Sequence, residues 1–167
     1  GAAASVKHPD ADAVPGGSSS GAAASVGFGL AACGIGSDTG GSVRIPSAWN
    51  DLVGLKTTPG TLSNTGVVPL CARFDTVGPL CRSVEDTALM LAALEGGTPA
   101  DLRGATLEGR RFMILETTAF DDIRDAPRAG FHSAVERMQA AGAQIARNSL
   151  DCVAEAMALS AILFTTE

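Results

Sequence analysis

Blocks of apolar residues with helix-like and strand-like spacing follow one another along the chain. Small apolar residues dominate 21–30 and predict a helix, and 31–35 is a short apolar run typical of a buried strand. A brief helix over 45–50 and a strand over 52–57 are expected next. Residues 61–79 contain many turn formers and keep neither period, so they predict an irregular loop.

The second half of the chain gives clearer boundaries. Ser83 and Asp86 have the spacing of a helix-capping pair, and Gly96 is placed to end that helix. Further elements are expected as a strand, a helix, a strand and a helix, over 112–115, 127–141, 143–147 and 151–164. This alternation predicts an α/β fold with a layered mixed sheet flanked by helices, in one domain spanning 1–167.

Two segments rich in glycine and serine flank the first helix. The first glycine–serine turn covers residues 15–21, and the second covers residues 36–42. Backbone amides at such turns form a partly positive concavity that suits an anion. Ser42 follows two glycines and precedes a short helix, where a serine is ordinarily a helix cap. The paired glycines, the nearby Asp38 and the upstream serine cluster favour a nucleophile instead.

Composition narrows the classes of partner. The net charge of −6 and the pI near 4.8 argue against nucleic acid, because no basic stripe can neutralise phosphates. No apolar run approaches the roughly 20 residues that span a bilayer, so no membrane partner is expected. The four cysteines are scattered and predict reduced thiols in a cytoplasmic protein rather than a zinc site or disulfides. They are Cys33, Cys71, Cys81 and Cys152.

Other catalytic or cofactor motifs fit the sequence less well. Residues 17–21 match the nucleophile-elbow pattern Gly-x-Ser-x-Gly with Ser19 at its centre, but that pattern needs an apolar strand leading into the serine. His132, a candidate base for such an enzyme, falls within an ordinary amphipathic helix. A dinucleotide loop would need its third glycine one place earlier than Gly40, and no phosphate-loop motif occurs. We therefore expect no metal and no organic cofactor.

Three motifs in order carry a resemblance to a known family. They read Gly-Gly-Ser-Ser-Ser-Gly at 16–21, Gly-Ser-Asp-Thr-Gly-Gly-Ser-Val-Arg-Ile-Pro at 36–46 and Leu-Val-Gly-Leu-Lys-Thr-Thr at 52–58. The sequence resembles the amidase signature family, densely over about 14–97 and thinly over the outer region 98–167. Ser18 and Ser42 are 24 residues apart (42 − 18 = 24), which is the separation found in that family.

The resemblance implies an amide hydrolase with a Ser–cis-Ser–Lys trio and an acyl-enzyme intermediate. It makes Ser42 the nucleophile and Ser18 the bridging serine, in a cis peptide after Gly17. The remaining site residues would hold the oxyanion (Thr39, Gly40 and Gly41) or support the turns (Asp38, Arg44 and Ser19). Residues 73–79 pass near the site in relatives. The implied substrate is a small-molecule amide.

The third member of the trio has no match in this chain. In the family, the catalytic lysine lies well upstream of the bridging serine, whereas this chain contains two lysines, Lys7 and Lys56, and neither has that position. We expect an internal piece of a longer enzyme, inactive by itself, with the lysine upstream. Two alternatives remain: an A-type subunit of a glutamine-dependent amidotransferase with a partner subunit, or a non-catalytic domain that retains the fold. Homo-oligomerisation also stays open.

Overall fold

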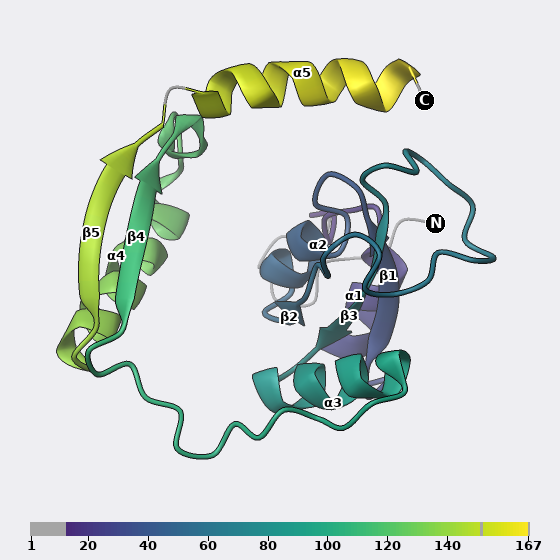
Figure 1. Ribbon diagram of the computed structural model, residues 1–167, viewed down its shortest axis with the longest axis horizontal. Helices are drawn as coiled ribbons and strands as arrows, with labels where there is room; N and C mark the ends of the chain where they lie inside the picture. Colours follow the sequence, from purple (N-terminus) through teal and green to yellow (C-terminus); the bar gives the residue numbers. More distant parts are fainter. Residues whose placement is uncertain (1–12, 151, 167) are drawn as a thin grey trace. The chain divides into compact units, whose positions relative to one another are not determined.

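The computed structural model describes residues 13–150 and 152–166 (Figure 1). Helices and strands both occur, and the strands pair in parallel and antiparallel fashion in two separate sheets, as expected for an α/β protein. The chain divides into two compact units, one ending at Asp101 and the other running from Leu102 to Thr166. The division lies close to residue 97, where the resemblance to the family becomes thin.

The first unit is built on a three-stranded antiparallel sheet. Its strands are β1 (Gly34–Asp38), β3 (Thr76–Cys81) and β2 (Val53–Gly54), in the order β1-β3-β2. β1 begins three residues later than the predicted strand over 31–35 and runs directly into the second glycine–serine turn. β2 is shorter than the strand predicted over 52–57. The end of β1 is in register with the start of β3, where Asp38 pairs with Thr76.

The central strand β3 was not predicted, because the expected loop over 61–79 covers the first four of its six residues. Gly78 and Pro79 are turn formers in local sequence, yet both are buried within β3. A side chain on Gly78 would overlap the carbonyl oxygen of Leu55. The Leu55 amide donates to the Pro79 carbonyl oxygen at 3.1 Å, which continues the contact between β2 and β3 beyond the two residues of β2. Glycine here permits a close approach of two backbones, as is typical of glycine inside a strand.

Three helices cover this sheet: α1 (Ser20–Gly27), α2 (Arg44–Trp49) and α3 (Val84–Glu95). The helices predicted over 21–30 and 45–50 are thus confirmed with small shifts at their ends. The core cluster contains Ala23 from α1, Val43 just before α2 and Leu80 from β3, all fully buried. The small side chains of α1 let the helix lie close to β1, where Gly34 approaches Ala22.

The capping predicted for the third helix is confirmed. The Ser83 side chain accepts a hydrogen bond from the Asp86 amide at 3.0 Å. Gly96 adopts a left-handed conformation (φ 69°) and ends α3. Both signals involve residues close together in the sequence, which explains why the ends of this helix could be predicted without knowledge of the fold.

The second unit contains a parallel pair of strands, β4 (Arg111–Glu116) and β5 (Gln144–Ser149). They are connected through the short 3-10 helix η1 (Thr118–Phe120) and α4 (Asp125–Ala140), which runs behind the pair in Figure 1. Gly142 follows α4 with φ 88°, as the predicted end of that helix required. The last element is α5 (Cys152–Thr166), and none of the described helices has the length and apolarity needed to cross a membrane.

Candidate active site

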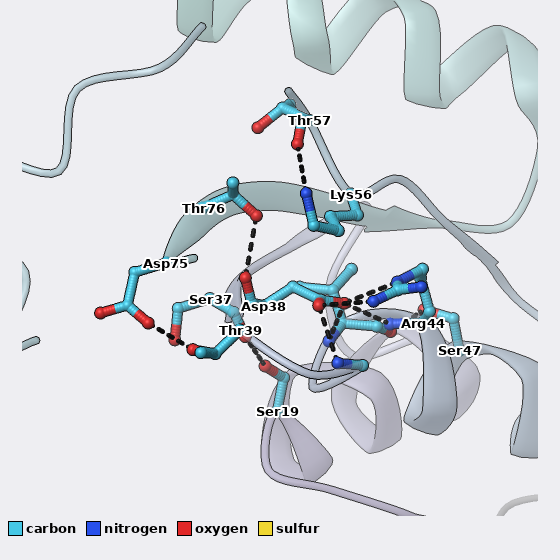
Figure 2. Close-up of polar contacts among 12 residues, drawn as sticks. Ser19, Ser37, Asp38, Thr39, Arg44, Ser47, Lys56, Thr57, Asp75 and Thr76 are labelled. Carbon is cyan, nitrogen blue, oxygen red and sulfur yellow. Dashed lines mark hydrogen bonds and ion pairs between the residues drawn. The ribbon is translucent and has the colours of Figure 1, made fainter. Parts of the chain in front are cut away.

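The second glycine–serine turn closes around the carboxylate of Asp38. Asp38 ends β1 and is fully buried. Its oxygens accept hydrogen bonds from the amides of Gly41 at 2.8 Å, Val43 at 3.1 Å and Arg44 at 3.3 Å. The Arg44 guanidinium adds two more, from Nε at 3.1 Å and Nη2 at 2.9 Å (Figure 2). Ser42 lies inside this closed turn, between two residues whose amides bind the same carboxylate.

Asp38 and Arg44 form an ion pair within the turn. Burial by itself raises the pKa of Asp38, but the Arg44 side chain and the three amides more than reverse this and hold it below the ordinary 3.8. The hydrogen bond to Asp38 raises the pKa of Arg44, against a smaller effect of burial. Both groups are therefore charged at neutral pH. The carboxylate also accepts the first free amides of α2, so the helix does not need the Ser42 hydroxyl as its cap.

The amides of the turn divide into two groups. The Gly41 amide points at Asp38 Oδ1, so it is directed into the turn. Gly41 was expected to supply an amide to the oxyanion, and in this structure that amide donates to the buried Asp38 carboxylate. Within residues 13–150 and 152–166, the amides of Thr39, Gly40 and Ser42 donate to no protein acceptor. These three donors remain available to a bound group.

The first glycine–serine turn lies directly against the second. The Ser19 amide donates to the Ser42 carbonyl oxygen at 3.1 Å, a contact between residues 23 positions apart (42 − 19 = 23). The peptide between Gly17 and Ser18 is cis. Ser18 is exposed and Ser42 is half-buried. The structure thus brings the backbones that carry the two predicted catalytic serines into contact.

Asn50 joins the first turn to the helix that follows the second. Its side-chain nitrogen donates to the carbonyl oxygens of Pro15 at 2.8 Å and Pro46 at 2.7 Å, and the residue is fully buried. Gly16 adopts φ 80° beside this contact, and a Cβ there would come within 3.0 Å of Pro46 Cα. The close approach of the two turns therefore depends on a glycine and on a buried asparagine.

Ser19 packs between the two turns. Its hydroxyl lies 3.5 Å from the Ser37 carbonyl oxygen, and a side chain on Gly36 would overlap it. No strand leads into Ser19 within the described residues 13–19, which contradicts the nucleophile-elbow alternative. The side chain supports the contact between the turns and is not presented at the end of a strand.

Lys56, which does not match the lysine position of the family, bonds to its own segment of the chain. Its ammonium donates to the carbonyl oxygen of the next residue, Thr57, at 2.9 Å, and the side chain is half-buried (Figure 2). Lys7 lies outside the described residues. The described residues also contain no group of three His, Cys, Asp or Glu side chains arranged to hold a metal ion.

Two residues beside the turn were not identified from the sequence. The Thr39 hydroxyl donates to the carboxylate of Asp75, and the Thr76 hydroxyl donates to the Asp38 carbonyl oxygen at 2.9 Å (Figure 2). Asp75 and Thr76 belong to the segment 73–79, which was expected to pass near the site, either shaping a substrate pocket or serving only as a loop. Their importance depends on the pairing of β3 with β1, which the sequence did not predict.

A cavity of about 590 Å³ lies in the second unit, near the carboxyl ends of β4 and β5. Its charged lining includes Glu116 and Arg147, which pair at 3.0 Å, together with Arg128. None of the predicted catalytic residues lines it. The predicted catalytic serines lie on the two turns of the first unit.

Comparison with known proteins identifies the chain's family. The Amidase family matches residues 4–167. The chain belongs to the amidase family. It is 41% identical over 153 residues to a 2-amino-5-chloromuconic acid deaminase of Comamonas testosteroni, covering 89% of this chain and 32% of that protein. It is 35% identical over 176 residues to the A subunit of a glutamyl-tRNA(Gln) amidotransferase from an Exiguobacterium species, covering 97% of this chain and 37% of that protein.

The fold is also shared with solved amidase-family structures. The crystal structure of the A subunit of glutamyl-tRNA(Gln) amidotransferase from Thermotoga maritima matches with a TM-score of 0.84 and 28% identity, over 93% of this chain and 37% of that one. The chain thus spans about a third of the length of the relatives that it matches, between 32% and 37% for these three. The α/β fold expected from the resemblance is confirmed.

Proposed function

We propose that the protein containing this chain hydrolyses the carbon–nitrogen bond of an amide, with Ser42 as its nucleophile. The observation that carries the proposal is the hydrogen bond from the Ser19 amide to the Ser42 carbonyl oxygen at 3.1 Å. It joins the turn that carries Ser18 to the turn that carries Ser42. Membership of the amidase family supports the reaction class.

In the proposed mechanism, Ser42 Oγ attacks the carbonyl carbon of the amide. Its proton passes to Ser18 Oγ, and the Ser18 proton passes to a neutral lysine from a segment upstream of this chain. Negative charge develops on the former carbonyl oxygen. The free amides of Thr39, Gly40 and Ser42 are the donors placed to stabilise it.

The second half of the reaction returns the proton and releases the product. Ser18 Oγ delivers its proton to the leaving nitrogen and receives the proton that the lysine had accepted, so the lysine is neutral again. The nitrogen departs as an amine or ammonia and leaves an ester on Ser42. Water then attacks the acyl carbon, its proton passes through Ser18 to the lysine, and the same relay returns a proton to Ser42 Oγ as the acid is released. Asp38 and Arg44 brace the turn through their ion pair and do not exchange protons with the substrate.

A second candidate function has its own support. The relatives include several A subunits of glutamyl-tRNA(Gln) amidotransferases, such as the Exiguobacterium protein at 35% identity. An A-type subunit would use the same serine chemistry on glutamine and pass ammonia to a partner protein. Release of ammonia from glutamine that depends on an added partner would favour this candidate over an independent hydrolase.

A fluorophosphonate probe tests the proposal in the full-length protein. We expect one phosphonyl group on Ser42, located by tandem mass spectrometry, and no labelling of a Ser42→Ala variant. Ser63→Ala is the matched control, because Ser63 is an exposed serine whose hydroxyl bonds to Thr65 in a loop. Labelling that persists in Ser42→Ala, or its absence from a folded full-length protein, would overturn the proposal in favour of a non-catalytic domain.

A further inference from the structure

A second buried carboxylate lies beside the proposed oxyanion donors and has no part in the mechanism above. Asp75 directly precedes β3 and is 6% exposed. Its carboxylate accepts hydrogen bonds from the Thr39 hydroxyl, from the Leu70 amide at 2.8 Å and from the Cys71 amide at 3.1 Å. The Asn64 side chain donates to its carbonyl oxygen at 2.9 Å. Hydrogen bonds from four residues therefore hold Asp75 in place, and its carboxylate holds the Thr39 side chain.

The neighbouring Thr76 holds the other end of the same peptide. Its hydroxyl donates to the Asp38 carbonyl oxygen at 2.9 Å, and both residues are buried. A trans peptide is planar, with its C=O and N–H pointing in opposite directions. Because the Asp38 carbonyl and the Thr39 amide belong to one peptide, fixing the carbonyl toward Thr76 also fixes the direction of the Thr39 N–H, away from β3.

We propose that Asp75 and Thr76 are positioning residues that orient the Thr39 amide toward the substrate oxygen. The inference rests on the proposed function, because it concerns a donor of the same oxyanion site. Asp75 fixes the Thr39 side chain, and Thr76 fixes the peptide plane. Preorganised donors stabilise developing charge because they need not reorient during the reaction. Thr39 is thereby held by Asp75 and Thr76, at the start of β3. The other end of the turn is held by the ion pair between Asp38 and Arg44, at the start of α2.

The protonation state of Asp75 agrees with this role. Burial raises the pKa of Asp75, but the hydrogen bonds from Thr39, Leu70 and Cys71 more than compensate and place it below the ordinary 3.8. An ionised carboxylate only accepts hydrogen bonds, so the Thr39 hydroxyl must act as the donor. The Thr39 side chain is thus restricted to one orientation at neutral pH.

The test measures phosphonylation of Ser42 in the full-length protein, as the maximal rate (kinact) and the half-saturating probe concentration (KI). Thr39→Val and Thr76→Val each remove one hydroxyl while keeping the branched shape, and Asp75→Asn removes the charge. We expect kinact to fall at least about 10-fold in each variant, and KI to change less than about twofold. The fall in kinact should stay below the roughly 100- to 1,000-fold effect of deleting an oxyanion donor, because the donor itself remains. Thr39→Ser restores the hydroxyl and is expected to restore kinact.

Thr87→Val is the matched control, because it removes a buried threonine hydroxyl that donates to the Ser83 carbonyl oxygen at 2.8 Å in α3, away from the turn. It should lower the thermal midpoint as much as Thr76→Val does and leave kinact unchanged. If kinact follows the thermal midpoint across all variants, or if Thr39→Ser and Thr39→Val react alike, the positioning role is wrong while the proposed function survives. A parent protein that is not labelled at Ser42 overturns both.

Discussion

Arg44 binds the buried carboxylate of Asp38 at two points, with Nη2 2.9 Å from Oδ1 and Nε 3.1 Å from Oδ2. The carboxylate is fully buried, whereas the Arg44 side chain is 51% exposed. The pair closes the turn that carries Ser42 and connects the end of β1 to the first residue of α2. The placement of the proposed nucleophile thus depends on this contact.

Removal of the guanidinium should destabilise the protein. We expect Arg44→Ala to lower the free energy of unfolding by about 1–3 kcal/mol. The value should lie toward the lower end of this range, because water partly screens the exposed Arg44 side chain. Arg44→Lys should lose less, since it keeps the charge but not the two-point contact. Urea unfolding measures the change. The control is Arg147→Ala, which breaks a pair whose two side chains are 50% and 52% exposed; an equal loss there would contradict the prediction.

The protein should lose stability in acid because of Asp38 and Asp75. Both have a pKa below the ordinary 3.8 in the folded state. The unfolded state therefore binds protons first as pH falls, so their contribution is complete well above 3.8 and is lost as pH falls through the folded pKa values. Urea unfolding at pH 7 and at about pH 3 should show this loss of unfolding free energy. The loss between the two pH values should be smaller in Asp75→Asn, because that variant lacks one of the two carboxylates. Stability that is constant or higher in acid would contradict the assignment.

The contact between the two glycine–serine turns should weaken when Asn50 is changed. Asn50→Ala leaves the carbonyl oxygens of Pro15 and Pro46 without this donor. We expect a loss of about 2–4 kcal/mol in unfolding free energy, because each buried acceptor left unpaired costs about 1–3 kcal/mol. Slower labelling of Ser42 should accompany it. Asn148→Ala serves as the control, because Asn148 is an exposed residue of β5. An equal loss of unfolding free energy in that variant would argue against the role of Asn50 in linking the two turns.

The cysteines should react with a thiol reagent in a defined order. Cys152 is exposed, whereas Cys71 is 1% and Cys81 0% exposed. Burial also raises the pKa of the Cys81 thiol, which lowers its thiolate fraction at neutral pH. Iodoacetamide followed by mass spectrometry should modify Cys152 in the native protein, and Cys71 and Cys81 after denaturation. Early modification of Cys81 would contradict the packing of β3.

The local signals in the sequence were sufficient for several elements. The cap at Ser83, the stop at Gly96 and the end of α4 at Gly142 involve residues within a few positions of one another. Such signals act before any tertiary contact forms, so the sequence alone was enough to place α3 and α4. The order of motifs likewise indicated the family to which the chain belongs.

Other features depend on partners that are distant in the sequence. β3 forms because Gly78 and Pro79 lie between two other strands, although the same residues favour a turn when read locally. The Gly41 amide is occupied because the chain folds back onto Asp38. Thr39 acquires a partner only when β3 brings Asp75 beside the turn, 36 residues further along the chain (75 − 39 = 36). The sequence by itself determined which residues are proposed to carry the chemistry. Only tertiary pairing decided which of their donors stay free, because a hydrogen-bond donor is occupied by whichever acceptor the fold places next to it.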